Sequence, residues 1–153
     1  MKLTVCELSN DPAQLAADWD KLVRHVAHKG SDLVLLPEMI FAPWFAASKV
    51  VNAEVWQEAV AGHDRWMTRL NELAPAHVIG TRPVEHDGKR LNEGFVWSGD
   101  YRAAHHKYYL PDEPGFWEAT WYERGQKEFS VTQVGSAACI GFAICKQIKT
   151  YSY

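Results

Sequence analysis

The sequence lacks any apolar stretch of about 18 or more residues, the length that a helix needs to cross a membrane. Residues 1–7 (MKLTVCE) become charged before any long apolar run can form, so we expect no secretory leader. An excess of positive charge is missing as well, since the net charge is −3 and the isoelectric point is about 6.1. We therefore predict a cytoplasmic protein with no membrane partner and no nucleic-acid partner.

Cysteine is scarce, with only Cys6, Cys139 and Cys145 in 153 residues. An odd number without C-x-x-C spacing argues against a disulfide framework and a zinc knuckle, and it favours a reducing compartment. Glycine-rich phosphate loops are absent, and His105 and His106 are neighbours on an expected strand, so their side chains should point to opposite faces. We therefore predict no cofactor and no metal.

Apolar residues make up 47% of the chain, enough for the core of one domain. A helix is expected over residues 12–29, because apolar residues recur every three or four positions between an Asp11-Pro12 start and a Gly30 stop. A second helix is expected over about residues 50–73, and a long ordered loop over residues 110–125. Strands are expected over residues 3–8, 32–36, 77–80, 91–98, 101–107, 129–134 and 138–144. This order predicts an α/β fold in which helices cover a mixed β-sheet.

Three polar residues stand at the carboxyl ends of predicted strands. Glu38 follows the run 32–36, whose continuous apolar residues suit a strand buried on both faces, while Lys107 and Cys145 end two later strands. Side chains at strand ends can project into a cleft while the strand fixes their position. Each residue alone has a plainer interpretation, Glu38 as a solvated loop charge, Lys107 as a surface lysine and Cys145 as a small buried apolar residue.

The segments around these residues resemble three motifs of one enzyme family. DLVLLPEM (32–39) resembles the strand that carries the catalytic glutamate of the nitrilase/amidase (carbon–nitrogen hydrolase) superfamily, YRAAHHKYYLP (101–111) resembles its lysine motif, and GFAIC (141–145) its nucleophile strand. The resemblance implies the N-terminal portion of a four-layer αββα sandwich, a mixed β-sheet with covering helices. We expect a partial domain over residues 1–145, truncated just after the nucleophile cysteine, and a short non-matching tail over residues 146–153.

The resemblance also implies roles for individual residues. Cys145 would attack an amide, carbamoyl or nitrile carbon, Glu38 would accept the thiol proton, and Lys107 would stabilise the developing oxyanion. Glu118 lies where related amidases carry a second glutamate that orients the lysine and the substrate, with a solvated loop residue as the alternative. Substrate-binding side chains are expected among the aromatic residues of the surrounding segments, which are Trp44, Phe45, Trp117 and Trp121.

The implied function is thiol-dependent hydrolysis of a small linear amide or N-carbamoyl amine with release of ammonia, in a homo-oligomer like complete members of the family. Two other interpretations stay open. The chain could be a truncated, catalytically inactive relative that is inert or pairs with another subunit through an uncovered sheet face. It could also be an unrelated α/β binding domain. The seven tryptophans have a plainer interpretation too, as core-filling side chains.

Overall fold

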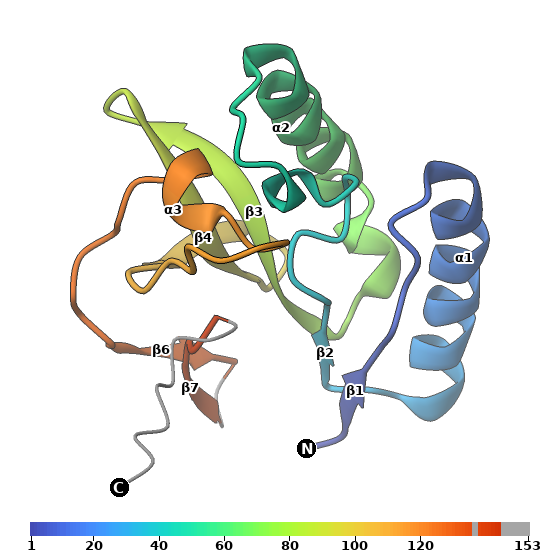
Figure 1. The fold of residues 1–153 in the computed structure, drawn as a ribbon. Helices are drawn as coiled ribbons and strands as arrows, with labels where there is room; N and C mark the ends of the chain where they lie inside the picture. The colour runs from blue at the N-terminus through green and yellow to red at the C-terminus, as the bar shows by residue number, and fades with distance from the viewer. Residues whose placement is uncertain (136–137, 145–153) are drawn as a thin grey trace, which may run out of the picture.

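The computed structural model describes residues 1–135 and 138–144, and a mixed β-sheet lies at its centre (Figure 1). The strands of this sheet are β1 (Leu3–Val5), β2 (Leu33–Leu35), β3 (His77–His86), β4 (Lys89–Trp97) and β5 (Tyr101–His106). They lie side by side in chain order, with β1, β2 and β3 parallel and β3, β4 and β5 antiparallel. A separate antiparallel hairpin consists of β6 (Val131–Val134) and β7 (Ala138–Gly141). The α/β class and the mixed sheet predicted from the sequence are confirmed.

Helix α1 (Pro12–Lys29) has the boundaries that the sequence predicted. The Asp11 side chain accepts hydrogen bonds from the backbone N–H groups of Ala13 and Gln14, which satisfies two donors that the first turn leaves free. Gly30 ends the helix in a left-handed conformation with φ of 60°. The buried stripe of the helix shares a core with Val34 and Val78 of the sheet, and its members are Leu15, Trp19, Leu22 and Val26.

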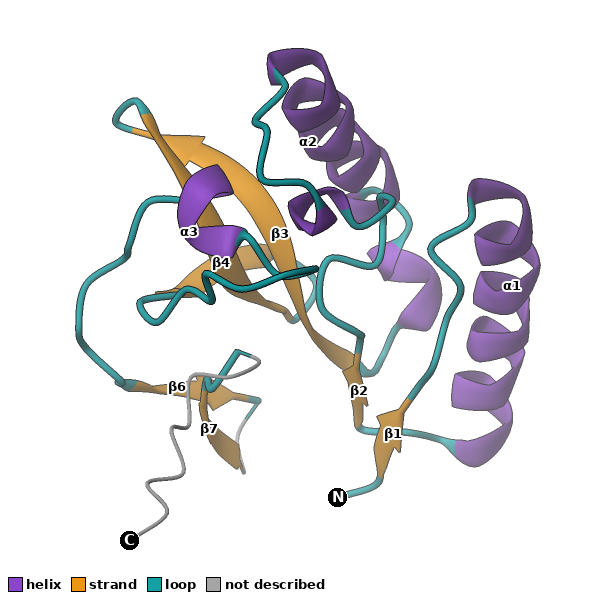
Figure 2. Cartoon of the chain, in the orientation of Figure 1, coloured by secondary structure: helices purple, strands orange, loops and turns teal. Residues whose placement is uncertain are grey.

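The second predicted helix is shorter than residues 50–73. Helix α2 covers Ala53–Met67, with Asn52 as its cap, and a separate 3-10 turn covers Leu70–Leu73. The first and last residues of this turn, Leu70 and Leu73, are fully buried. Their apolar spacing continues that of α2, so the sequence pattern predicted one helix where the structure has a helix and a separate turn. Figure 2 shows α1 and α2 on the same side of the sheet, with the β6–β7 hairpin away from them.

The sequence predicted only part of the longest hairpin of the sheet. The predicted strand 77–80 continues in the structure to His86 and turns directly into β4. Asp87 and Gly88 make the turn with φ of 51° and 73°, as an Asp-Gly pair does in a two-residue hairpin whose backbone twist matches that of the strands. The Asp-Gly signal was in the sequence, but the polar residues beside it concealed the strand ends.

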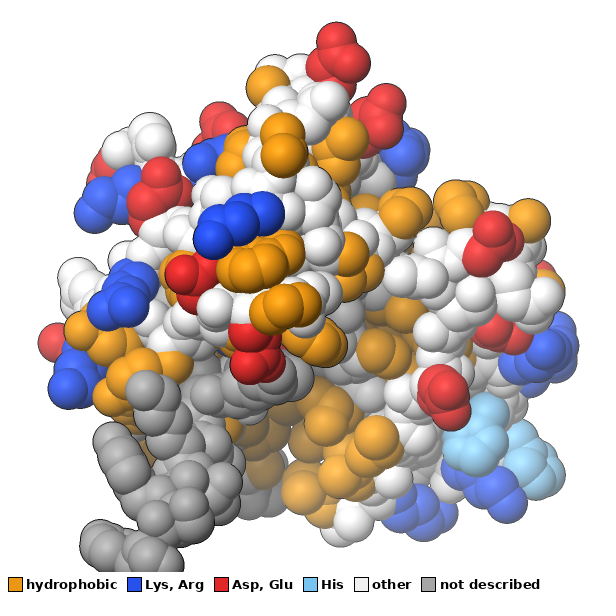
Figure 3. Space-filling model, in the orientation of Figure 1, with side chains coloured by type: hydrophobic (Ala, Val, Ile, Leu, Met, Phe, Trp, Pro, Cys, Tyr) orange, Lys and Arg blue, Asp and Glu red, His pale blue; other side chains and the backbone are white. Residues whose placement is uncertain are grey.

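The two faces of the sheet differ in what covers them. The hairpin β6–β7 and residues 142–144 pack on the face opposite the helices, where their apolar side chains form a cluster with Leu33, Ile79 and Val96. Toward β1 this face is open, because Leu3, Val5 and Leu35 are 52%, 66% and 38% exposed. Figure 3 shows hydrophobic side chains gathered in this region. The prediction that strand 32–36 is buried on both faces is therefore wrong for Leu35, since no described segment covers it.

The segment predicted as a long loop contains one short helix, α3 (Glu118–Trp121). Its aromatic residues belong to a second core cluster, together with Phe45 of the 3-10 turn Phe45–Ala47 and Trp56 of α2. Among the helices of the described residues, none combines the length and the apolar character that a membrane span requires.

Candidate active site

The backbone around Glu38 is fixed by the neighbouring strand. Leu36 donates a hydrogen bond from its N–H to the carbonyl of Ile79, and Met39 donates from its N–H to Oγ1 of Thr81 at 2.8 Å. Met39 has φ of 51°, a conformation that costs a side-chain-bearing residue energy and that its burial at 2% exposure helps to hold. Glu38 therefore sits on a sharp, restrained turn at the end of β2.

Lys107 is a fully buried cation between two carboxylates. Its Nζ lies 2.9 Å from Oε1 of Glu38 and 2.7 Å from Oε2 of Glu118, and its side chain is 0% exposed. A buried ammonium is costly unless counter-charges replace its water, and two carboxylates from separate segments do so here. The backbone of Lys107 is fixed as well, because its N–H donates to the carbonyl of Asn92 and its carbonyl accepts from the N–H of Gly125.

Glu118 is the first residue of α3, and its side chain is 2% exposed. The structure therefore excludes the alternative of a solvated loop residue and places this carboxylate against Lys107. The neighbouring backbone ties the loop in position, because Trp117 donates from its N–H to the carbonyl of Ala46 at 2.7 Å and Ala119 donates to the carbonyl of Pro111 at 2.9 Å.

Two further residues beside this charge cluster were missed from the sequence. Asn92 of β4, 1% exposed, donates from Nδ2 to Oε1 of Glu38 at 2.8 Å. Tyr122 is buried, and this burial, together with the negative charges of Glu118 and Glu38, raises the pKa of its phenol well above 10. The available signals were a polar residue inside an apolar strand and an aromatic next to Trp121, which are too common to single out.

Trp44 and Trp117 lie on the same aromatic cluster as Tyr122. Nε1 of Trp44 donates to the carbonyl of Gly115 at 2.9 Å, and the Nζ of Lys49 lies 4.3 Å from the centre of a Trp117 ring. Both tryptophans are partly exposed, so they form the outer edge of the cluster next to Glu118. Their substrate-binding role stays a prediction.

Cys145, the predicted nucleophile, lies outside the described residues, and the chain before it can be followed to Ile144. A cavity of about 760 Å³ is lined by Glu38, by Thr81 and by the whole segment 138–144. Phe142 in that segment packs so closely on Gly94 of β4 that a Cβ atom there would lie 2.5 Å from its ring. The described chain therefore runs along the cavity onto which Glu38 opens as far as Ile144.

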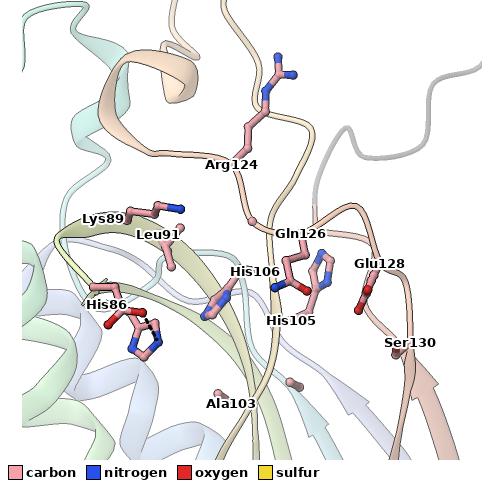
Figure 4. Close-up of a pocket in the computed structure, with 13 residues that line it drawn as sticks. His86, Lys89, Leu91, Ala103, His105, His106, Arg124, Gln126, Glu128 and Ser130 are labelled. Atoms are coloured by element: carbon pink, nitrogen blue, oxygen red, sulfur yellow. Dashed lines mark ion pairs between the residues drawn. The ribbon is translucent and has the colours of Figure 1, made fainter.

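A second cavity, of about 510 Å³, lies between the β3–β4 hairpin, β5 and residues 124–130 (Figure 4). His86 and His106 line it, and Figure 4 shows Arg124 extending away from its centre. Of the predicted site residues that the structure describes, none lines this cavity. Across the part of the chain that the structure describes, no three His, Cys, Asp or Glu side chains are grouped as a metal site requires.

Comparison with known proteins assigns the fold to a family. The sequence profile of carbon–nitrogen hydrolases matches residues 2–150. The chain belongs to this family. No curated protein matches the chain. Membership agrees with the resemblance carried by the three motifs of the sequence.

Solved structures of the family share the fold at low identity. A carbon–nitrogen hydrolase from Helicobacter pylori G27 superposes with a TM-score of 0.62 at 20% identity, covering 84% of this chain and 45% of that one. An amidase from Nesterenkonia sp. AN1 in complex with butyramide gives 0.62 at 20% identity, covering 88% and 52%. A glutamine-dependent NAD+ synthetase from Acinetobacter baumannii gives 0.63 at 17% identity, covering 91% and 26%. The chain therefore spans about half or less of the length of these structures and matches the N-terminal portion of their fold.

Proposed function

We propose that this chain carries the catalytic residues of a thiol hydrolase that cleaves carbon–nitrogen bonds in small linear amides or N-carbamoyl amines. The observation that carries the proposal is the buried Lys107 ammonium, held 2.9 Å from Glu38 and 2.7 Å from Glu118. Apolar side chains of similar volume are often as stabilising as a buried ion pair, so stability alone does not explain why charged residues are present here. Strongly desolvated charges beside a cavity are typical of sites that stabilise charge during a reaction.

The proposed reaction begins at Cys145. As Sγ bonds to the amide carbon, the thiol proton passes to Glu38, and the Lys107 ammonium stabilises the negative charge that develops on the substrate oxygen. The proton then moves from Glu38 to the leaving nitrogen as the carbon–nitrogen bond breaks, and ammonia departs. Water attacks the resulting thioester, its proton passes through Glu38 to Sγ, and the carboxylic acid and the free thiol are released.

Glu118 has a separate task in this scheme. When Glu38 accepts the thiol proton, it loses the negative charge that was paired with Lys107. Glu118 then remains as the counter-charge of the buried ammonium, at 2.7 Å, so the cation is not left unpaired during the step that needs its charge. We assign Glu118 to the orientation and charge balance of Lys107.

The proposed substrate is small and carries an apolar portion. The support is the aromatic cluster beside Glu118, whose outer edge is formed by Trp44 and Trp117. The related amidase from Nesterenkonia was solved with butyramide, a short aliphatic amide. The odd number of cysteines without C-x-x-C spacing favours a reducing compartment, so we propose that the reaction takes place in the cytoplasm. Within the chain, we assign the catalytic residues to a partial domain over residues 1–145.

The test is ammonia release from butyramide and from an N-carbamoyl amine by the 153-residue chain. We expect turnover with one of these substrate classes, and we expect Cys145→Ala to abolish it. Cys139→Ala is the matched control, because Cys139 is an exposed cysteine on β7 of the same segment. Unchanged ammonia release in Cys145→Ala would show that the catalytic assignment is wrong.

A second candidate function rests on the open sheet face. Leu3, Val5 and Leu35 leave an apolar patch on an edge of the sheet, and such patches on soluble proteins commonly mark contact sites. The candidate is a catalytically inactive subunit that pairs with another chain through this face. Light scattering across a range of concentrations tests it, and Val5→Lys should then keep the chain monomeric. A wild-type chain that stays monomeric and releases ammonia would exclude this candidate.

A further inference from the structure

Asn92 connects the two charged residues of the proposed site. Its side-chain Nδ2 donates to Oε1 of Glu38 at 2.8 Å, and its backbone carbonyl accepts from the N–H of Lys107 at 2.9 Å. The Nζ of Lys107 approaches the same Oε1 of Glu38, at 2.9 Å. One carboxylate oxygen of Glu38 therefore receives two donors, and Asn92 contacts the segments that supply both the base and the cation.

The orientation of the Asn92 amide follows from chemistry. Turning it over would place its oxygen against the Glu38 carboxylate, and two acceptors without a proton between them repel. With the amide oriented as observed, Oδ1 is buried and has no hydrogen-bond partner among the described residues. Burying an unpaired amide oxygen is unfavourable, so a residue that served only to pack would be apolar here. An apolar residue of the same size would lack the Nδ2 donor that contacts Glu38.

An amide also suits this position better than a charged residue. A carboxylate at position 92 would repel Glu38, and a second cation beside Lys107 would be a further buried charge to compensate. The neutral donor of Asn92 fixes the geometry of Glu38 without adding a charge. Among the described residues, none donates to the other oxygen, Oε2.

We propose that Asn92 is a positioning residue that, together with Lys107, holds Oε1 of Glu38 and so leaves Oε2 as the oxygen that exchanges protons. The proposal rests on the proposed hydrolase function, since it names the atom of Glu38 that takes the proton from the Cys145 thiol and passes it to the leaving nitrogen. Glu38 is 21% exposed and lines the 760 Å³ cavity, so a proton can reach this carboxylate from the cavity side.

The first measurement is the pH profile of ammonia release by the 153-residue chain and its variants. Asn92→Leu removes the donor at similar size, and we expect it to lower kcat roughly 10- to 100-fold with little change in KM, because geometry and not substrate binding is lost. The acid limb of the profile should move to higher pH, because the Glu38 carboxylate loses a hydrogen-bond donor. Asn92→Asp should move it further, since it adds a like charge. The control is Asn71→Leu, an exposed asparagine on the 3-10 turn, which should match wild type.

The second measurement reports on Glu38 without activity. Carbon-13 titration of the glutamate carboxyls, with Glu38 assigned from the spectrum of Glu38→Gln, should show a higher pKa for Glu38 in Asn92→Leu than in wild type. If Asn92→Leu does not fold, Asn92→Ala removes the donor with a smaller side chain and gives the same comparison. A Glu38 pKa that is equal in wild type and variant would overturn the proposal. A wild-type chain without ammonia release would instead contradict the hydrolase function, and the titration would still decide the role of Asn92.

Discussion

Lys107 Nζ and Glu118 Oε2 lie 2.7 Å apart, with both side chains withdrawn from solvent. The two residues come from different parts of the fold, Lys107 from the end of β5 and Glu118 from the start of α3. Because the ammonium has 0% exposure, its only compensation for lost water is the protein around it. Loss of this pair should therefore both destabilise the loop between β5 and α3 and remove a negative charge from the candidate site.

Replacing Glu118 with glutamine should weaken both stability and catalysis. Glu118→Gln removes one of the two counter-charges of a buried cation, and we expect a loss of about 3 kcal/mol in the free energy of unfolding. Urea denaturation measures it, and ammonia release should fall in parallel. Glu58→Gln is the control, because Glu58 is an exposed glutamate on α2 and its change should leave both quantities near wild type. Equal stability of the two variants would contradict the role given to Glu118.

His63 should make the protein less stable in mild acid. Burial lowers the pKa of His63 to about 4 from an ordinary value of 6.5, although its Nδ1 is hydrogen-bonded to the carbonyl of Ala59 at 2.8 Å. Because the folded-state pKa is depressed, the stability linked to neutral His63 is present above pH 6.5 and is lost as pH falls toward 4. The loss amounts to about 3 kcal/mol across this window.

Urea denaturation of wild type and His63→Phe between pH 4 and 7 checks this linkage. The wild-type free energy of unfolding should decline through the window, while the decline should be shallower in His63→Phe, which has no group to protonate at this site. His28→Gln serves as the control for loss of an exposed histidine and should follow the wild-type curve. Parallel curves for wild type and His63→Phe would mean that another group causes the acid sensitivity.

The cysteines should differ in their rates of alkylation by iodoacetamide. Burial raises the pKa of the Cys6 thiol to about 11, so little thiolate exists near pH 8 and labelling there should be slow. Cys139 is exposed and should react at the rate of an ordinary thiol. Under the proposed function, Cys145 should react fastest, because the nearby cation favours its thiolate. Peptide mass spectrometry over time gives the three rates, and slower labelling of Cys145 than of Cys139 would count against an assembled site.

Gly94 should be intolerant of a side chain. A Cβ at this position would lie 2.5 Å from the ring of Phe142, so Gly94→Ala should cost roughly 1–3 kcal/mol of stability through overpacking. Gly141→Ala is the control, since among the described residues a Cβ there would meet a methyl group of Val131 at 4.0 Å and nothing closer. Adding Phe142→Leu to Gly94→Ala should recover part of the loss in thermal unfolding, and a double variant worse than the sum of both single changes would refute the contact.

Local signals in the sequence were sufficient for much of the fold. Helix α1 was predicted at both ends because Asp11 and Gly30 act on the backbone next to them, within one turn. The extension of β3 to His86 was missed because its last residues are polar and exposed, so only the partner strand β4 defines it. The exposure of Leu35 was missed for a related reason, since an apolar run does not reveal which of its faces has a partner.

In the candidate site, too, some residues could be identified from local sequence motifs and others only from the structure. Glu38, Lys107 and Glu118 were named from motifs, and the structure brings these three side chains together. Asn92 was not named, because its contact with Glu38 joins residues far apart in the chain and depends on how β4 lies beside β5. The role of Cys145 stays a prediction, since the described chain ends at Ile144.

The position of Glu118 late in the chain sets an order of assembly during synthesis. A ribosome releases Glu38 first, then Lys107, and the α3 carboxylate last, so the ammonium meets one counter-charge before the second exists. Until α3 has been synthesised, Lys107 lacks one of its two counter-charges, so we expect its ammonium to stay hydrated. The neighbouring aromatic cluster also lacks Trp121 at that stage. We therefore expect the arrival of one short helix to dehydrate the cation and to complete the second core, before the segment 138–144 that lines the cavity has followed in the chain.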